Sequence, residues 1–325
     1  MNKITVVIPN YNGKNFLKDC LESLYDQVPD TPEFEVLIVD NASRDGSVEQ
    51  AQEAFPEVRV IQLSENTGFC HAVNIGIRES ESPYIILLNN DTKVKSKFIK
   101  SLYDVIVRDK KIFSASAKML MWDRPELIDD AGDQYNVLGW AYARGKGKYA
   151  KDYDQPARIF SSCGGAAIYR RSILEQIGLF DELHFAYVED LDLGYRARIH
   201  GYRNVYAPRA EVLHFGSAST GSRYNPRKTE LASANNVYVV FKNMPPLQLI
   251  WNLPFLFTGF LIKWLFFCHK RMGMIYLRGL CKGFRRCLSS EGRSRRVRFR
   301  RENLRNYLHI QGLLYLNLMR FPSKE

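Results

Sequence analysis

The first hundred residues alternate between two hydrophobic patterns. Four short runs are apolar at nearly every position and consist mainly of Val, Ile, Leu and aromatic residues; they cover residues 4–9, 34–40, 58–63 and 84–89. Continuous apolar runs of this length are typical of strands that are covered on both faces. Between these runs, apolar residues recur at helical spacing over residues 16–24, 47–55 and 69–80. This alternation predicts an α/β fold with a doubly wound, mostly parallel sheet.

Each of the four predicted strands ends in polar residues. These ends read Pro9-Asn10-Tyr11-Asn12, Asp40-Asn41-Ser43, Ser64-Glu65-Asn66 and Asn89-Asn90-Asp91. A single polar end is explained by a turn, because Asn and Asp tolerate left-handed backbone and bond their own chain. Four polar ends on one edge favour a binding site, since ligands of such sheets lie beyond the carboxyl ends of the strands.

The carboxylates at this edge fit a nucleotide that is bound together with a metal. Asp40 can accept hydrogen bonds from an imide N–H or a ribose hydroxyl, and Asp91 offers a hard oxygen for Mg²⁺ or Mn²⁺. A nucleoside diphosphate with a bridging metal matches both groups. Neither GxGxxG nor GxxxxGK[ST] occurs in the chain, so dinucleotide-type and P-loop-type phosphate binding are excluded.

Four segments of this region resemble the successive motifs of the family 2 glycosyltransferases: VVIPNYNG, VLIVDNASRDGS, NTGFCHAVNIGI and LLNNDT. The family has the GT-A fold and transfers a sugar from a nucleotide donor with inversion at the anomeric carbon. The resemblance implies that Asp40 contacts the base, and that Pro9 and Tyr11 line the nucleotide pocket. Asn66, in the third polar strand end, is predicted to bind substrate at the same edge.

The resemblance also identifies Asn90-Asp91 as the DXD-like element, with Asn90 at the substrate and Asp91 as a ligand of the metal. The element departs from the Asp-x-Asp that is frequent in the family, because its first two positions are Asn89 and Asn90. With one fewer carboxylate, we expect weaker metal binding that depends more on the diphosphate of the donor.

A second group of candidate residues lies between 163 and 203. The small residues around Gly165 let the backbone approach another group closely, and Gly165 is predicted to contact substrate. Glu189, Asp190 and Asp192 gather at the start of a predicted helix that ends near Gly201. Acidic residues also favour a helix N-terminus without any chemistry. Inverting transfer, however, requires a base for the proton of the acceptor hydroxyl, and a carboxylate suits this role.

The segment EDLDLGYR resembles the E-D-x-D-x-x-x-R segment of the family, which implies that Asp190 is the catalytic base. Glu189 and Asp192 then orient the base or bind the acceptor, and Arg196 binds phosphate or acidic groups. His214 follows a further predicted strand and matches a position that often assists the metal or the diphosphate, although a lone His is more often structural. The motifs of the resemblance span roughly residues 3–220.

Positive charge is concentrated in the last quarter of the chain. Residues 241–325 contain 17 Lys or Arg against 3 Asp or Glu, whereas residues 1–240 contain 29 against 32. We therefore predict a GT-A domain over 1–240 and a basic, amphipathic helical region over 241–325. The six cysteines show no paired spacing and the chain starts without a signal peptide, so we expect reduced thiols in the cytosol.

The basic region carries the pattern of a membrane-associating segment. Residues 249–268 are long enough to span a bilayer, but Asn252, Pro254 and Lys263 disfavour a span. A single span would also place the catalytic domain outside the cell, away from cytosolic nucleotide sugars, so an interfacial or re-entrant segment is predicted. Residues 274–288 form an amphipathic pattern, and six arginines within 293–301 attract anionic lipid. A solvated tail or a nucleic-acid patch is the alternative, but no nucleic-acid module accompanies it.

Two hypotheses follow. The first is an inverting, metal-dependent glycosyltransferase at the inner face of a bacterial membrane, which extends a lipid-linked glycan for the cell surface and resembles rhamnosyltransferases. The second is a non-catalytic nucleotide-binding or membrane-binding module with a degenerate site. The Asn-Asn-Asp element supports the second hypothesis, whereas the intact Glu189-Asp190 pair supports the first.

Overall fold

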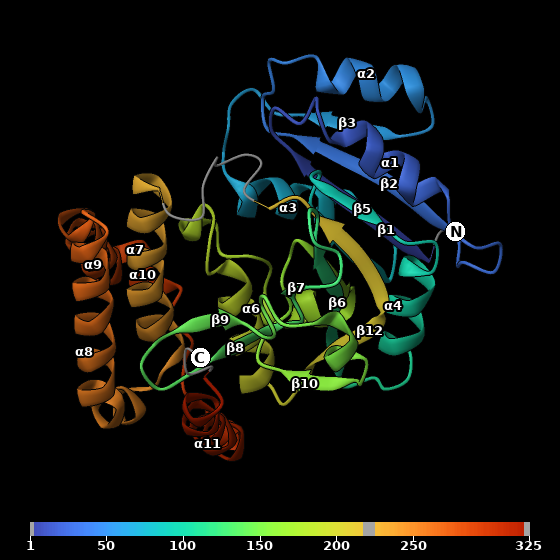
Figure 1. Ribbon diagram of the computed structural model, residues 1–325. Coiled ribbons are helices and arrows are strands. Elements are labelled where there is room, and N and C mark those ends of the chain that lie inside the picture. The colour runs from blue at the N-terminus through green and yellow to red at the C-terminus, as the bar shows by residue number, and fades with distance from the viewer. Residues whose placement is uncertain (1–2, 217–224, 322–325) are drawn as a thin grey trace.

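The computed structural model describes residues 3–216 and 225–321 of the chain. Its centre is a ten-stranded sheet with the strand order β10-β12-β6-β11-β4-β1-β2-β3, and β5 and β7 add to it at β12 and β6. Helices cover both faces of this sheet, and the C-terminal helices stand to one side of it (Figure 1). The predicted α/β class is confirmed.

The parallel part of the sheet matches the four predicted strands. It consists of β1 (Ile4–Asn10), β2 (Phe34–Asp40), β3 (Arg59–Gln62) and β4 (Tyr84–Leu88). β1 lies between β2 and β4, and Asn10 is in register with Asp40, so the polar ends of these strands lie at one edge. The connecting helices are α1 (Leu17–Tyr25), α2 (Ser47–Ala54) and α3 (Phe69–Arg78).

Alternate side chains of these strands enter two separate cores. Ile4, Val6 and Ile8 of β1 pack with α1, α2 and α4 (Phe98–Ile106) on one face of the sheet. Val7 of β1 packs with α3, α5 (Arg171–Ile177) and α6 (Glu189–Ile199) on the other face. Both faces of β1, β2 and β4 are therefore buried, which is why these strands read as continuous apolar runs, whereas β3 lies at the edge of the sheet and exposes Arg59 and Gln62.

The second half of the sheet is mixed, because β11 runs antiparallel to both β4 and β6 while β12 runs parallel to β6. Its strands are β5 (Thr92–Val94), β6 (Ile112–Met121), β7 (Ile128–Asp130), β10 (Ala157–Ile159), β11 (Ala166–Arg170) and β12 (Arg203–His214). A separate hairpin pairs β8 (Asp133–Tyr135) with β9 (Ala141–Ala143). Short 3-10 turns cover Ala150–Tyr153, Glu182–His184 and Arg301–Asn303.

The C-terminal helices are packed into the same core as the sheet domain. They are α7 (Pro226–Asn243), α8 (Pro246–His269), α9 (Gly273–Leu288), α10 (Ser290–Ser294) and α11 (Leu304–Met319). Leu191 of α6 shares one apolar cluster with Val239, Leu256 and Leu314 from α7, α8 and α11. The boundary predicted after residue 240 therefore falls inside α7, and removing residues 241–325 would expose this shared core.

Two of these helices present apolar side chains to solvent. In α8, only 17% of the most apolar window is buried, and this helix is long and apolar enough to cross a membrane. In α9, Gly279 and Gly283 press against α7, while Met274, Phe284 and Leu288 point outward. The face of α9 that the sequence predicts for a membrane surface is thus exposed, and the opposite face holds the helix to the protein.

Candidate active site

Hydrogen bonds join the polar ends of β1, β2 and β4. The Asn10 side-chain amide donates to Asp40 Oδ1 at 2.8 Å and to Ser47 Oγ at 3.0 Å. Asn90 donates in turn to Asn10 Oδ1 at 2.7 Å. A Cβ at Gly13 would lie 2.2 Å from Asn10 Oδ1, so only glycine lets the first loop cover this network. The structure thus brings Asp40 and Asn90 together through Asn10, as their shared edge predicts.

Asp40 uses its carboxylate inside the loop network. Asp40 is only 2% exposed, and its carboxylate accepts hydrogen bonds from Asn10, from the Ser43 hydroxyl and from the Ser43 N–H. In this arrangement Asp40 shapes the rim of the site. Contact of Asp40 with a nucleotide base remains a prediction.

The other residues predicted for the nucleotide pocket lie along the same rim. Tyr11 is 41% exposed directly after β1, and Pro9 is partly exposed within it. Asn66 accepts a hydrogen bond from the N–H of Gly68 at 3.0 Å, which shapes the turn before α3. Tyr11 therefore offers an accessible ring, whereas the amide oxygen of Asn66 already has a partner.

A carboxylate–imidazole–carboxylate chain links three strands at this edge. His214 Nε2, at the end of β12, lies 3.5 Å from Asp91 Oδ1. His214 Nδ1 lies 2.7 Å from Asp129 Oδ2 on β7, and Lys146 contacts the other oxygen of Asp129. A carboxylate behind the second nitrogen is the usual way in which proteins orient a metal-binding histidine.

The positive charge of His214 and the negative charges of Asp91 and Asp129 stabilise one another. Burial opposes protonation of His214, but the hydrogen bond to Asp129 and the nearby Asp91 outweigh it and raise the pKa of His214 to about 9. Burial alone would raise the pKa of Asp129, yet His214 and Lys146 hold that pKa at about 2. Two anions therefore face one imidazole, an arrangement in which a divalent cation can replace the proton on Nε2. A carboxylate oxygen and an imidazole nitrogen fit Mg²⁺ or Mn²⁺ shared with a diphosphate.

Asp190 lies at the start of α6 against the glycine pair. A Cβ at Gly164 would lie 2.6 Å from Asp190 Oδ1, so the close approach that the small residues indicate is made by Asp190 itself. The next residue, Gly165, accepts a hydrogen bond from the Asn89 N–H at 2.9 Å. The Gly164-Gly165 pair thus connects Asp190 with the Asn89-Asn90-Asp91 element.

The surroundings of Asp190 give its carboxyl a pKa that suits a general base. Its Oδ1 atom is buried and has no hydrogen-bond partner among the described residues. Burial raises the pKa of Asp190 to about 7, an effect that the N–H of Gly164 opposes and the charge of Asp130 reinforces. Burial and the charge of Asp190 likewise raise the pKa of Glu189. A base whose pKa lies near neutral pH is well matched to proton transfer.

The loop before Asp190 is held in an unusual conformation. Phe185, Tyr187 and Val188 all have positive φ angles, of 61°, 71° and 72°. Such angles are costly for bulky and β-branched residues. The side-chain amide of Asn235, on α7, donates to the carbonyls of residues 184, 186 and 187 at 2.9, 2.9 and 2.7 Å. Asn235 therefore keeps the strained loop, and with it the base, in place.

We predict that Asn235→Ala lowers turnover by about 10²-fold, because a displacement of about 1 Å at a reacting group has that effect. Donor affinity should stay within about twofold, since the strand-end network does not include Asn235. The matched control is Asn306→Ala, which removes an amide-to-carbonyl hydrogen bond to Ile199, at the opposite end of α6 from this loop. Steady-state kinetics of both variants test the prediction, and equal turnover in the two would contradict it.

Asp192 and Arg196 form part of an internal ion-pair network. Asp192 accepts from Arg196 at 3.0 Å, from Lys242 at 2.8 Å and from Asn243 at 2.8 Å. The Arg196 guanidinium also donates to the carbonyls of residues 177, 178 and 179. Both side chains are buried and fully partnered. In this arrangement the two residues join α6 to α7, and their binding of substrate remains a prediction.

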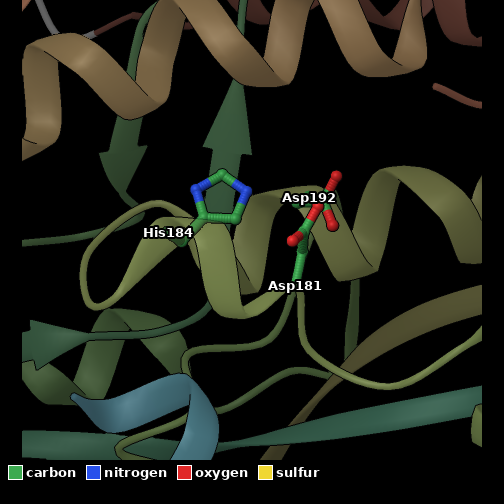
Figure 2. A group of neighbouring side chains, drawn as sticks. All are labelled: Asp181, His184 and Asp192. Carbon is green, nitrogen blue, oxygen red and sulfur yellow. The ribbon is translucent and has the colours of Figure 1, made fainter. Parts of the chain in front are cut away.

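Asp181, His184 and Asp192 form a buried group that resembles a metal site, with ligand atoms within 4.8 Å of one another (Figure 2). The Lys242 ammonium lies 2.7 Å from Asp181 and 2.8 Å from Asp192, and Arg295 contacts the other oxygen of Asp181. These cations already balance the two carboxylates. Burial lowers the pKa of His184 to about 4, so the imidazole is neutral. We interpret the group as a structural salt bridge between α6, α7 and the chain after α10.

Several residues of the site carry no signal in the sequence. Asp129 lies in the stretch Leu127–Asp130, outside the family motifs, and Asn235 lies in a helix with many polar residues. Asn10 sits within a motif, but its role as the centre of the loop network depends on partners 30 to 80 positions away. Two general features of the sequence could have pointed weakly to these residues: an Asn within a helix, for Asn235, and paired acids at a strand end, for Asp129.

Sequence comparison finds bacterial proteins that are similar to this chain. The chain is 31% identical over 215 residues to the N-acetylglucosaminyl-diphospho-decaprenol L-rhamnosyltransferase of Mycobacterium tuberculosis (strain ATCC 25618 / H37Rv), covering 57% of this chain and 68% of the relative. It is 28% identical over 248 residues to the teichoic acid poly(glycerol phosphate) polymerase of Staphylococcus epidermidis, covering 75% of this chain and 32% of the relative.

Solved structures show the same fold at low identity. GalNAc-T7, solved with UDP, GalNAc and Mn²⁺, superposes with a TM-score of 0.59 and 18% identity over 74% of this chain and 48% of that chain. The mannosyltransferase PcManGT from Pyrobaculum calidifontis, solved with GDP-Man and Mn²⁺, gives a TM-score of 0.52 and 16% identity over 96% and 85%. These likenesses support the GT-A type fold. The family model described as Glycosyl transferase family 2 matches residues 5–178, and the chain therefore belongs to the family 2 glycosyltransferases.

Proposed function

We propose that this protein is an inverting, metal-dependent glycosyltransferase that moves a sugar from a nucleotide-diphosphate donor to a hydroxyl of a glycan acceptor. The observation that carries the proposal is the position of Asp190: its Oδ1 has no hydrogen-bond partner among the described residues and lies against Gly164, and the adjacent Gly165 accepts a hydrogen bond from Asn89. Relatives named for rhamnosyl transfer and for teichoic acid polymerisation support a role in bacterial cell-surface polysaccharide synthesis.

In the proposed mechanism, Asp190 accepts the proton of the acceptor hydroxyl as that oxygen attacks the anomeric carbon from the face opposite the diphosphate. Glu189, whose Oε2 atom is buried and unpartnered, orients the base or the acceptor. Asp91 and His214 would hold Mg²⁺ or Mn²⁺, and Asp129 fixes the ring of His214. Bound there, the ion would supply positive charge for the departing diphosphate.

The strand-end network positions the donor in this proposal. Tyr11 provides an exposed ring for the base, and Pro9, Asp40, Asn66 and Asn90 shape the rim on which the nucleotide lies. The non-catalytic alternative, a binding module with a degenerate site, predicts donor binding without turnover. The pKa of Asp190, raised to about 7, favours the enzyme.

The purified full-length protein should be screened with nucleotide sugars for thermal stabilisation, with and without Mn²⁺. A donor that stabilises the protein in the presence of Mn²⁺ is expected to be hydrolysed slowly and to be transferred when an acceptor is added. Stabilisation by one or more donors with no hydrolysis and no transfer to any acceptor would refute the enzyme and leave the binding module.

We further propose that the protein acts at the cytoplasmic face of the plasma membrane, with the exposed sides of α8 and α9 at the lipid surface. Of the six arginines between 293 and 301, Arg295 and Arg296 have partners inside the protein, Asp181 and the carbonyl of Met244. Arg298 and Arg301 are exposed, and these contribute to attraction for anionic lipid.

Arg298→Gln/Arg301→Gln should weaken binding to phosphatidylglycerol-containing vesicles by about tenfold or more, since each surface Arg contributes about 1 kcal/mol. Lys97→Gln/Lys110→Gln, which makes the same charge change on the sheet domain, should leave vesicle binding unchanged. Flotation at two salt concentrations provides the measurement. If the parent protein floats with neither anionic nor neutral vesicles, the membrane assignment is wrong and nucleic-acid binding should be tested.

A further inference from the structure

A large cavity opens directly beside the Asp91–His214–Asp129 chain. Its volume is about 1490 Å³, and Asp129 and His214 form part of its wall. The remaining wall comes from the end of β6, from residues 141–148 around β9, from residues 157–160 around β10, and from α11. Pockets for single small ligands are typically 300–1,000 Å³. This cavity is therefore large enough for several linked sugar or phosphate units.

The wall of the cavity is strongly basic. It contains two acidic residues, Asp123 and Asp129, and the second of these is already paired with His214 and Lys146. Against them stand eight basic residues: Arg124, Arg144, Lys146, Lys148, Arg158, Arg198, Lys228 and Arg320. Such an excess attracts an anion and not a neutral glycan.

Positive groups crowd together at one part of this wall. Burial and the charge of Arg158 lower the pKa of Arg198 to about 10. Burial, Arg198 and Arg158 also lower the pKa of His309. Arg158 is exposed at this part of the wall and has no carboxylate partner among the described residues. A phosphate group at this point would relieve the repulsion and accept charge-assisted hydrogen bonds.

Aromatic rings line the two ends of the same cavity. Trp122 and Phe215 contact each other beside His214, with ring centroids 6.0 Å apart. At the other end, Phe321 packs against Tyr142 and Trp140, and Trp140 donates a hydrogen bond to a carbonyl of α8 at 3.0 Å. The carbon faces of sugar rings pack well on such aromatic rings. Because Trp140 is bonded to α8, the distal end of the cavity, at Phe321, lies next to this apolar helix.

We propose that this cavity binds an acceptor that carries phosphate, with phosphate groups along the wall that presents the exposed Arg158 and Arg320 and the receiving sugar near Phe215 and His214. The inference rests on the proposed glycosyl transfer and names the chemical class of its acceptor. Two sources offer this chemistry: a water-soluble polyol phosphate chain, and a diphosphate that joins a glycan to a lipid. The position of α8 beside the distal end suits the second source, because the lipid would then lie at the exposed apolar face.

The test uses the full-length protein and direct binding without donor. The probes are a soluble glycerol phosphate oligomer, phosphatidylcholine vesicles doped with a polyprenyl diphosphate, and a neutral maltooligosaccharide of similar length. The variant is Arg158→Gln/Arg320→Gln, because both side chains are exposed and their loss leaves the core intact. The matched control is Arg108→Gln/Arg305→Gln, two exposed arginines outside the cavity, one of them also on α11.

We expect the parent to bind at least one phosphate probe, with affinity that falls as salt increases. The cavity variant should lose about tenfold or more of that affinity, which corresponds to about 1.4 kcal/mol, and the control should lose less than twofold. Binding of the soluble oligomer assigns the polyol phosphate source. Binding of the doped vesicles beyond that of undoped ones assigns the lipid diphosphate source.

The inference is overturned if the parent binds neither phosphate probe, if the neutral oligosaccharide binds as tightly, or if the cavity variant keeps parental affinity. Failure of the proposed function gives a different pattern. In that case the nucleotide-sugar screen shows no transfer, while loss of phosphate binding in the cavity variant persists. Donor affinity of the cavity variant should equal that of the parent, since none of its changes lies in the strand-end network.

Discussion

Asp190→Asn is expected to lower glycosyl transfer by about 10²- to 10⁴-fold, the range that a general base contributes. The amide keeps the shape of the carboxylate but cannot accept the proton of the acceptor hydroxyl. Donor affinity should be unchanged, because the strand-end network around Asn10 does not include Asp190. Steady-state kinetics combined with calorimetry of donor binding measure both quantities. The control Glu175→Gln changes an exposed carboxylate of α5 and should retain parental turnover.

The pH profile provides an independent readout of the same residue. Only the charged carboxylate can act as base, and the pKa of Asp190 is raised to about 7 by burial and by Asp130. The rate should therefore rise between about pH 6 and 8 and level off above. The folded state favours the protonated form, so the contribution of Asp190 to stability falls as pH rises from about 4, its ordinary pKa, to about 7, and stays at this lower level above pH 7. Asp190→Asn should consequently raise the melting temperature at pH 8 relative to the parent.

Turnover within threefold of the parent would remove Asp190 from the role of base. A rate that is flat between pH 6 and 8 would do the same, provided that chemistry limits turnover. A raised melting temperature alone does not identify a catalytic residue, because any buried carboxylate of raised pKa gives that result. The kinetic and thermal readouts together separate a base from a merely buried acid.

Asp91→Ala is expected to abolish the part of donor affinity that depends on Mn²⁺ or Mg²⁺. Asp91 faces His214 Nε2 at 3.5 Å, and these two residues are the proposed protein ligands. Donor affinity in the presence of Mn²⁺ should fall by about tenfold or more, whereas affinity measured with chelator should match that of the parent. Transfer should fall at least as far, because charge on the departing diphosphate is no longer balanced.

Asp129→Asn gives a graded comparison for the metal assignment. Asp129 contacts His214 Nδ1 at 2.7 Å, and loss of such a supporting carboxylate typically lowers metal affinity by about 10- to 100-fold. Asp129→Asn should therefore shift metal-dependent donor binding to higher Mn²⁺ concentration, whereas Asp91→Ala should abolish the metal-dependent part. Calorimetry of donor binding with and without Mn²⁺ compares the variants. If the parent binds donor equally well under both conditions, Asp91 is not a metal ligand.

Much of the fold and part of the candidate site followed from the sequence alone. The strands β1, β2 and β4 are apolar on both faces, and this local property does not depend on which helices cover them. The polar ends had to share an edge, since parallel strands end on the same side of a sheet. The motifs around Asp91 and Asp190 indicated the family, because their residue types and spacing can be read from the sequence without the fold.

Tertiary structure decided the partners of charged and polar side chains. Asp190 and Asp192 are two positions apart, yet the first keeps an Oδ1 without a hydrogen-bond partner in the described part of the chain and the second is neutralised by Arg196 and Lys242. Helix periodicity turns such neighbours in different directions, so their roles depend on what packs against each face. Asp129 meets His214 across 85 positions, and Asn235 holds a loop about 50 positions away. Contacts of this length arise only from the folded chain, because hydrogen bonds and ion pairs act over a few ångströms in space and not along the sequence.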